Sequence, residues 1–227
     1  MTAAAIVVAG GSGQRFGNAG KSFAMTNGMP MAWWSLAAAA NATLVDEIVL
    51  VCGEHSQAAA GALLSMFDET KPVTLALGGA RRQDSARAGL CATSDDVDVV
   101  AIHDAARPLV TADLLDLVIE TAREHGAVIT AVPVSDTIKR VQENTVLETV
   151  PRDDLVAVQT PQAFRKHLLL EAFAAAESNG TTVTDEASLV ESLGHAVHVI
   201  PGRNDNIKVT YPADLHLVQA LFEARTR

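Results

Sequence analysis

A glycine-rich segment with two cations follows the first apolar run of the chain. Residues 7–24 are VVAGGSGQRFGNAGKSFA, and Arg15 and Lys21 stand among the glycines. Glycine lets backbone N–H groups approach phosphate oxygens closely, and the two cationic side chains neutralise phosphoryl charge. The preceding apolar run, residues 4–9, is typical of a buried parallel strand that delivers a loop to the edge of a sheet. The pattern predicts a phosphate-binding loop.

Two general phosphate-binding motifs match this loop only in part. The dinucleotide fingerprint GxGxxG starts at Gly11 and Gly13, but Phe16 occupies its last glycine position and no acidic residue follows at the distance of a ribose ligand. The Walker A motif GxxxxGK[ST] ends correctly at residues 20–22, but Arg15 occupies its first glycine position and would obstruct the turn around the β-phosphate. A P-loop NTPase and a nucleotide-binding module without catalysis both stay open as alternatives.

The acidic charge of the whole chain argues against a nucleic-acid-binding protein. The formal net charge is -10 and the isoelectric point is near 5.1, whereas nucleic-acid-binding proteins normally present a basic face. No apolar run approaches the ~18 residues of a membrane span and no signal-peptide pattern opens the sequence, so we expect a cytoplasmic protein. Cys52 and Cys91 lack metal-ligand spacing, and we expect no metal site built from side chains.

Strand-like and helix-like stretches alternate along nearly the whole chain. This alternation predicts an α/β fold with a mostly parallel sheet covered by helices on both faces, in one domain spanning residues 1–227. We expect strands at residues 4–9, 47–52, 73–77, 97–103, 127–132, 156–160 and 196–200. We expect helices at residues 31–42, 56–66, 83–92, 112–125, 165–177, 186–193 and 213–225, with Thr111 as the cap of the fourth.

One segment interrupts the alternation. Residues 138–141 and 146–149 alternate apolar and polar side chains about a Glu143-Asn144 turn, which predicts a β-hairpin arm at about residues 136–152. An isolated two-stranded hairpin is marginally stable in water. We therefore expect the arm to pack on something else, such as a second subunit.

Three further motifs follow the glycine-rich loop in order: HDAARP at residues 103–108, TDEAS at 184–188 and DNIKVT at 205–210. With them, the sequence resembles the sugar-phosphate nucleotidyltransferases, and over nearly its whole length it is most similar to the 2-C-methyl-D-erythritol 4-phosphate cytidylyltransferases. The resemblance implies a Rossmann-like three-layer sandwich with an inserted hairpin arm. It also implies transfer of the cytidylyl group of CTP to 2-C-methyl-D-erythritol 4-phosphate, with release of pyrophosphate, in non-mevalonate isoprenoid biosynthesis. A ribitol-5-phosphate cytidylyltransferase is the nearest alternative, because that family shares the loop and a similar aspartate-arginine motif.

The resemblance also implies which residues bind CTP. Arg15 and Lys21 correspond to the family's transition-state stabilisers at the α-phosphate. The other implied nucleotide contacts are Ala9, Gly10, Gly11, Gly13, Gly79, Ala80, Ser85, Asp104 and Ala105. The family usually has a PKQ triplet where this chain has residues 20–22, and an acidic residue where it has Ala80. From spacing alone, Ser85 fits the first turn of the following helix equally well.

For the acceptor phosphate, the resemblance implies catalytic roles for Arg152 and Lys208, since a guanidinium suits a bidentate grip on a phosphate. The implied acceptor-binding residues are Asp104, Arg107, Thr137, Thr160 and Thr184. Thr137 and Arg152 would reach the neighbouring subunit's site, so we expect a homodimer joined through the arm. Mg²⁺ is expected as the cofactor, bound mainly through the CTP phosphates.

Overall fold

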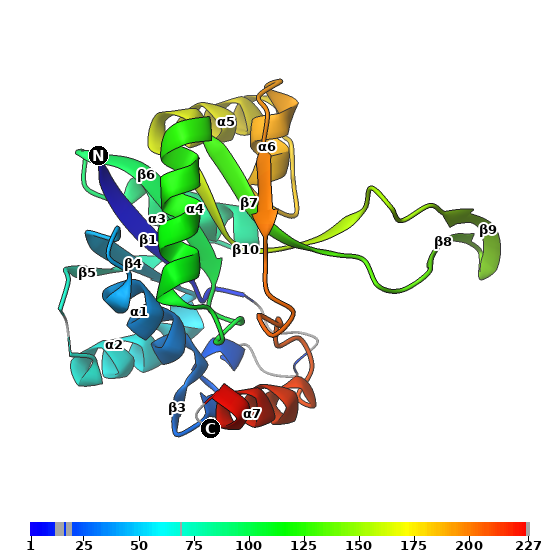
Figure 1. Ribbon diagram of the computed structural model, residues 1–227. Helices are drawn as coiled ribbons and strands as arrows, with labels where there is room; N and C mark the ends of the chain where they lie inside the picture. Colours follow the sequence, from blue (N-terminus) through cyan, green and yellow to red (C-terminus); the bar gives the residue numbers. More distant parts are fainter. Residues whose placement is uncertain (12–15, 17–19, 69, 226–227) are drawn as a thin grey trace.

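The computed structural model of the protein describes residues 1–11, 16, 20–68 and 70–225. Seven strands form one sheet in the order β11-β7-β10-β6-β1-β4-β5 (Figure 1). These strands are β1 (Thr2–Val8), β4 (Glu47–Cys52), β5 (Val73–Leu77), β6 (Val97–Asp104), β7 (Ala127–Pro133), β10 (Val156–Arg165) and β11 (His198–Pro201). Every neighbouring pair is parallel except the two pairs formed by β10. The predicted mostly parallel sheet is therefore confirmed.

Helices occupy the sequence between the strands as the alternation predicts. They are α1 (Met31–Asn41), α2 (Gln57–Met66), α3 (Arg82–Cys91), α4 (Ala112–His125), α5 (Lys166–Asn179), α6 (Ala187–Ser192) and α7 (Asp214–Arg225), with the short 3-10 turns η2 (Lys21–Phe23) and η3 (Glu54–Ser56). The hydroxyl of Thr111 accepts a hydrogen bond from the Leu114 backbone N–H and caps α4, which confirms the predicted cap. No helix within the described ranges has the length and apolar character needed to cross a membrane.

The sheet is the middle of three layers because its central strands are apolar on both faces. Along β1, Ala3, Ala5 and Val7 belong to a core cluster formed with α1, α2 and α4. The alternate residues Ala4 and Ile6 belong to a second cluster formed with α3, α5 and α6. Side chains of successive strand residues point to opposite faces, so a wholly apolar strand binds helices on both sides. This arrangement is the three-layer sandwich expected from the sequence.

A third, smaller core cluster attaches the C-terminal helix α7 beside the start of α1. The ring centroids of Trp34 and Phe222 lie 4.5 Å apart, and the Trp34 indole N–H donates to the Thr26 carbonyl at 3.0 Å. Thr26 belongs to the small hairpin formed by β2 (Met25–Thr26) and β3 (Met29–Pro30). Another hydrogen bond joins the Asn27 backbone N–H to the Gln219 side chain at 2.7 Å. The segment that follows the glycine-rich loop is therefore held by α7.

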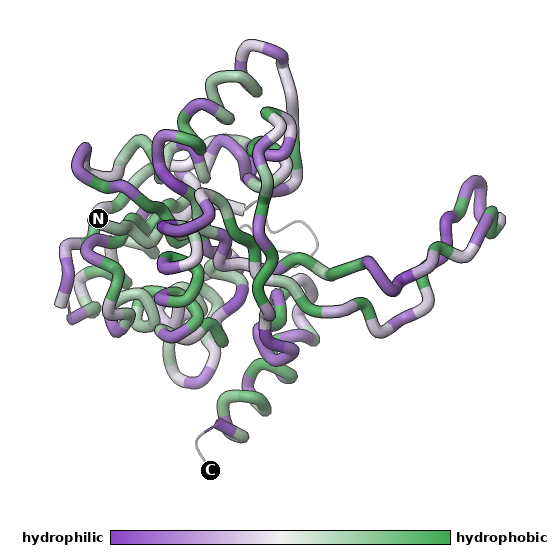
Figure 2. Tube along the Cα trace, turned by 45° about the horizontal axis from the view of Figure 1, so that its top comes forward, coloured by the Kyte–Doolittle hydropathy of each residue, from purple (hydrophilic) through white to green (hydrophobic). Residues whose placement is uncertain are grey.

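The predicted arm is present as the hairpin of β8 (Ile138–Gln142) and β9 (Thr145–Val150), and it extends away from the three layers (Figures 1 and 2). Glu143 and Asn144 have φ angles of 47° and 63°. Positive φ at both central residues is typical of the tight type I′ turn that matches strand twist. The predicted turn position is therefore confirmed.

β10 is longer than the sequence pattern suggests. The expected strand ends at residue 160, whereas β10 continues to Arg165. The ladder with β7 shifts register between Gln159 and Gln162, so Thr160 and Pro161 stand outside the regular pairing. Because proline cannot donate to a ladder, the strand continues past it only with this irregularity.

Candidate active site

The predicted nucleotide-binding residues lie along the carboxyl edge of the sheet. Ala9 and Gly10 follow β1, Gly79 follows β5, and Ala105 follows β6. Backbone hydrogen bonds continue the parallel ladder into these loops: the Ala9 N–H donates to the Val51 carbonyl at 2.7 Å, and the Ala105 N–H donates to the Val8 carbonyl at 3.0 Å. Open α/β sheets bind ligands in this position. Arg15 and Gly13 lie outside the described residues, and Gly11 is exposed at the start of the loop.

Ser85 packs against the loop that follows β1 and the loop that follows β5. Its side chain is fully buried, and its hydroxyl donates to the Arg81 carbonyl at 3.2 Å. A Cβ atom added at Gly78 would lie 2.5 Å from the Ser85 hydroxyl oxygen, and one added at Gly10 would lie 3.0 Å from it. Only glycine fits at such close approaches. Ser85 therefore sets the distance between the β1 loop and the β5 loop, and Ala80 lies exposed beyond them.

Asp104, at the end of β6, is the centre of an ion network. One carboxylate oxygen of Asp104 accepts from the Arg82 Nε at 2.9 Å, and the other accepts from the Lys208 Nζ at 2.5 Å. The Nη1 atom of Arg82 also donates to both carboxylate oxygens of Glu186, at 2.8 Å each. Asp104 and Glu186 are only 6% and 1% exposed. Two buried carboxylates and two cations thus alternate in one network, from Glu186 through Arg82 and Asp104 to Lys208.

Burial and the two cations act in opposite directions on these carboxyl groups. Burial alone would raise the pKa of Asp104, but Arg82 and Lys208 outweigh it and hold that pKa well below its ordinary range. For Glu186 burial prevails over Arg82, and the pKa is raised. Asp104 is therefore permanently ionised near neutral pH and fixes Lys208, which excludes it as a general base.

A second, largely neutral network supports Asp104 from behind. The Thr160 hydroxyl accepts from the Asp104 backbone N–H at 3.0 Å and lies 3.2 Å from the His103 Nδ1. The other ring nitrogen of His103 lies 3.1 Å from the Arg107 carbonyl. Complete burial lowers the pKa of His103 to about 4, so the imidazole is neutral near pH 7. Arg107 donates in turn to the Asn206 carbonyl at 2.8 Å.

Part of these two networks lines a cleft of about 380 Å³. Its walls are Arg82, Asp104, Arg107, Ile129, Val158, Gln159, Thr160, Gln162, Thr184, Asp185, Ser188, Glu191 and Lys208. Five predicted site residues thus come together in one cavity, although they are distant in the sequence: Asp104, Arg107, Thr160, Thr184 and Lys208. Thr184 is exposed and does not cap α6: the N-cap residue is Glu186, and the Ser188 backbone N–H of the first turn donates to Asp185 at 3.2 Å.

Lys21 connects the glycine-rich loop to this cleft. It opens the turn η2, and its Nζ donates to the Val209 carbonyl at 3.1 Å. Val209 is adjacent in sequence to Lys208, whose amine lies in the cleft. Two cations from opposite ends of the chain therefore meet at one segment. A Walker A lysine would instead stand at the start of a long helix, whereas η2 spans three residues.

The arm residues Thr137 and Arg152 are separate from the cleft of their own chain. Both are exposed, and the Arg152 guanidinium donates to the Ser135 carbonyl at the base of the arm. Neither residue is among those lining the cleft. The structure therefore brings together the acceptor residues of the body but not the two on the arm.

The polar residues that the sequence did not predict as part of the site include Arg82 and Gln162, which line the cleft, and Glu186, which pairs with Arg82 behind it. The Gln162 amide donates to an Asp185 carboxylate oxygen at 3.1 Å, while its own buried oxygen has no hydrogen-bond partner among the described residues. Glu186 resembles an ordinary first-turn acid in the sequence TDEAS. No local pattern shows that it is buried.

A glycine-rich segment that leaves the carboxyl edge of an α/β sheet, together with a cleft that holds Arg82, Arg107 and Lys208, is the arrangement expected of a nucleotidyltransferase, which joins a nucleoside triphosphate to a phosphorylated acceptor. The family model described as IspD: 2-C-methyl-D-erythritol 4-phosphate cytidylyltransferase matches residues 3–224, and the chain belongs to this family of CTP-dependent cytidylyltransferases. The 2-C-methyl-D-erythritol 4-phosphate cytidylyltransferase of Bacillus licheniformis is 40% identical over 224 residues, with 98% of this chain and 96% of that protein covered.

Two solved structures have the same fold. The crystal structure of 2-C-methyl-D-erythritol 4-phosphate cytidylyltransferase from Thermus thermophilus superimposes with a TM-score of 0.81 at 32% identity, covering 97% of this chain and 98% of that one. The structure of 4-diphosphocytidyl-2C-methyl-D-erythritol synthase from Anaerococcus prevotii gives a TM-score of 0.86 at 28% identity and covers 98% of both chains. The fold and family expected from the sequence motifs are confirmed.

Proposed function

We propose that the protein transfers the cytidylyl group of CTP to 2-C-methyl-D-erythritol 4-phosphate, giving 4-diphosphocytidyl-2-C-methyl-D-erythritol and pyrophosphate in the non-mevalonate pathway of isoprenoid precursor synthesis. The family match over residues 3–224 is the observation that carries this proposal. Arg82, Arg107 and Lys208 in the cleft support it, because a phosphorylated acceptor needs cationic side chains to bind it on a protein whose net charge is -10.

In the proposed reaction an oxygen of the acceptor phosphate attacks the α-phosphorus of CTP. The new P–O bond forms as the bond between the α-phosphorus and the bridging oxygen breaks, and pyrophosphate leaves. The attacking group is already an anion near neutral pH, so no general base is required. The permanently ionised, doubly hydrogen-bonded state of Asp104 supports this scheme. Catalysis then consists of alignment and neutralisation of charge.

We infer that the residues divide between the two substrates as follows. Arg15 and Lys21 neutralise the triphosphate, while the loops of Gly10, Gly11, Gly13, Gly79, Ala80, Ser85 and Ala105 shape the site for the ribose and base. Lys208, Arg107, Thr160 and Thr184 bind the acceptor. The Lys21 contact with the Val209 carbonyl supports this division, since it holds Lys21 against the residue that follows Lys208 in the sequence.

We further propose that Mg²⁺ enters with CTP and is held mainly by the phosphates. Among the described residues no three acids, histidines or cysteines cluster as a metal site. Both oxygens of Asp104 already accept hydrogen bonds from cations, so this carboxylate suits a water-mediated contact rather than direct ligation. When bound, the ion would neutralise part of the triphosphate charge.

The arm supports a homodimer in which Thr137 and Arg152 of one subunit complete the acceptor site of the other. Its strands carry Val141, Val146 and Leu147, each more than half exposed in the single chain. Exposed apolar side chains on an isolated hairpin favour contact with another protein surface.

A pyrophosphate-release assay tests the proposed function directly. The four nucleoside triphosphates are each combined with methylerythritol phosphate and with ribitol 5-phosphate in the presence of Mg²⁺. CTP with methylerythritol phosphate should give the highest kcat/KM. A higher value with ribitol 5-phosphate would establish the alternative acceptor, and nucleotide hydrolysis without any acceptor would contradict cytidylyl transfer.

The variant Lys21→Ala tests the inferred division of roles. If Lys21 neutralises charge that forms in the transition state, kcat should fall by about 100-fold while CTP affinity changes by less than about fivefold. Lys166→Ala is a matched control, because Lys166 lies at the start of α5 and donates to the Ser94 carbonyl, outside the cleft. Equal losses in kcat and affinity would mean that Lys21 only binds the nucleotide.

A further inference from the structure

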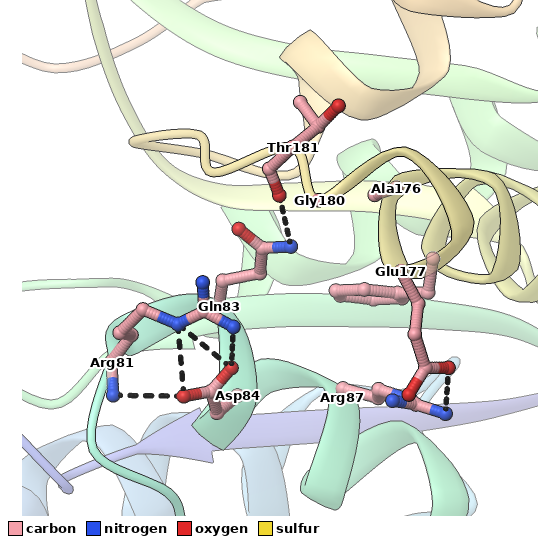
Figure 3. Close-up of a pocket in the computed structure, with 9 residues that line it drawn as sticks. Arg81, Gln83, Asp84, Arg87, Ala176, Glu177, Gly180 and Thr181 are labelled. Atoms are coloured by element: carbon pink, nitrogen blue, oxygen red, sulfur yellow. Dashed lines mark hydrogen bonds and ion pairs between the residues drawn. The ribbon is translucent and has the colours of Figure 1, made fainter.

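Hydrogen bonds join the start of α3 to residues 181–183, which directly precede the TDEAS motif. The Arg81 guanidinium donates to the Thr182 hydroxyl at 2.9 Å. The Gln83 amide donates to the Thr181 carbonyl at 3.3 Å and accepts from the Val183 backbone N–H at 3.1 Å. Figure 3 shows Gln83 pointing from α3 toward Thr181, while Arg81 folds back on Asp84. Because α3 follows the loop of Gly78 and Gly79 directly, this contact joins the nucleotide side of the site to the acceptor side.

Arg82 stands between Arg81 and Gln83 in the sequence, and its side chain lines the cleft. Its side chain is 25% exposed, and it bridges Asp104 and Glu186, which are 22 and 104 residues away in the sequence. A buried carboxylate needs a paired cation, and the two acids share this one. Arginine suits the position because its planar guanidinium presents several donors in fixed directions, whereas lysine presents a single charged atom.

The orientation of the Asp104 carboxylate depends on this bridge. One of its oxygens is held by the Arg82 Nε, so the other oxygen faces the Lys208 amine. The chain of charges therefore runs from Glu186 through Arg82 and Asp104 to Lys208. Lys208 is half-buried at the end of this chain, and its amine is the group inferred above to bind the acceptor phosphate.

We propose that Arg82 is a positioning residue that places Lys208 for the acceptor phosphate by orienting Asp104 between them. This inference rests on the proposed function, since it takes Lys208 as the acceptor-binding cation. Two consequences follow. Loss of Arg82 should weaken use of the acceptor much more than use of CTP, and it should have little further effect once Lys208 is gone.

The experiment is a double-mutant cycle of Arg82→Gln and Lys208→Ala, followed by steady-state kinetics with each substrate varied in turn. Arg87→Gln is the matched control on the same helix, because Arg87 pairs with Glu177 on the surface and does not line the cleft. In the wild-type background Arg82→Gln should lower kcat/KM for the acceptor by about 10- to 100-fold and change the KM for CTP by less than about threefold. In the Lys208→Ala background, Arg82→Gln should lower kcat/KM for the acceptor by less than about threefold.

The outcomes separate the inference from the proposed function. Absence of cytidylyl transfer by the wild type would contradict the proposed function itself. With an active wild type, an equal cost of Arg82→Gln in both backgrounds, or equal changes in both KM values, would overturn the positioning role. If Arg82→Gln does not fold, the cycle is run with Arg82→Lys, which keeps the charge but cannot span both carboxylates; full activity of that variant would also overturn the proposal.

Discussion

The acceptor cleft and the β8–β9 arm both carry cations assigned to the acceptor phosphate, but they hold them by different means. In the cleft, Lys208 is fixed by the buried Asp104. On the arm, Arg152 is exposed, and its guanidinium donates to the Ser135 carbonyl at the base of its own hairpin. A buried, low-dielectric network therefore positions Lys208 within one chain. Arg152 needs the surface of another subunit to give it a defined position, and this difference is the structural reason to expect a dimer.

The two regions also differ in how a single substitution should propagate. The cleft residues are joined by hydrogen bonds into networks, so their losses should be coupled and should affect stability as well as activity. The arm residues make few contacts with the body, so their losses should affect the reaction or the assembly and leave folding nearly unchanged.

The largest expected effect lies behind the cleft, at His103. Burial lowers its pKa to about 4 from the ordinary 6.5. Because the folded state binds this proton less readily than the unfolded chain, the contribution of His103 to stability is complete above about pH 6.5 and is lost as the pH falls through about 4. Between about pH 7 and pH 4, the wild type should lose roughly 3 kcal/mol more unfolding free energy than His103→Gln. Urea unfolding across this range measures it, and parallel pH profiles would contradict the assignment.

The next effect concerns Lys208, one of the cations in the cleft. Lys208→Ala should lower kcat/KM for the acceptor by about 100-fold, because a charge-assisted hydrogen bond to phosphate is lost. The KM for CTP should change by less than about threefold. Lys166→Ala, outside the cleft, should keep wild-type kinetics. A loss shared equally between the two substrates would remove Lys208 from the acceptor side of the site.

The corresponding substitution on the arm should have a smaller effect. Arg152→Ala should lower kcat/KM for the acceptor by about tenfold, since an exposed guanidinium that becomes ordered only in the assembly contributes less than one held by burial. Arg140→Ala is the matched control, because Arg140 pairs with Glu148 within the arm. Steady-state kinetics with the acceptor varied distinguish the two. Equal kinetics for both variants would show that Arg152 does not contact the acceptor.

The smallest effect on the single chain is expected at the apolar surface of the arm. Val146→Asp should shift the protein from dimer toward monomer in sedimentation experiments, while the unfolding free energy of the monomer changes by less than about 0.5 kcal/mol. Thr145→Asp adds the same charge at a neighbouring exposed polar position of β9. If both variants stay dimeric, the arm does not form the interface.

The sequence predicts the elements better than it predicts the contacts between them. The Glu143-Asn144 turn is located to the residue because the turn chemistry is local. Asp104 and Lys208 are found through motifs, although 104 residues separate them. Arg82 and Glu186 are missed because GGARRQDSA and TDEAS resemble solvated helix starts, and only the packing of distant segments buries Glu186 and pairs it with Arg82. The prediction for β10 ends too early because a register irregularity admits Pro161 into a long strand.

In the proposed dimer, the arm of one subunit completes the cleft of the other. Mixing subunits of Lys208→Ala with subunits of Arg152→Ala tests it, with pyrophosphate release as the readout. If the arm acts across the dimer, each mixed dimer has one site with both defects and one site with neither, so random exchange should restore about a quarter of wild-type activity. If the arm served its own chain, every site in the mixture would keep one defect. Activity no higher than the mean of the two separate variants would contradict the account.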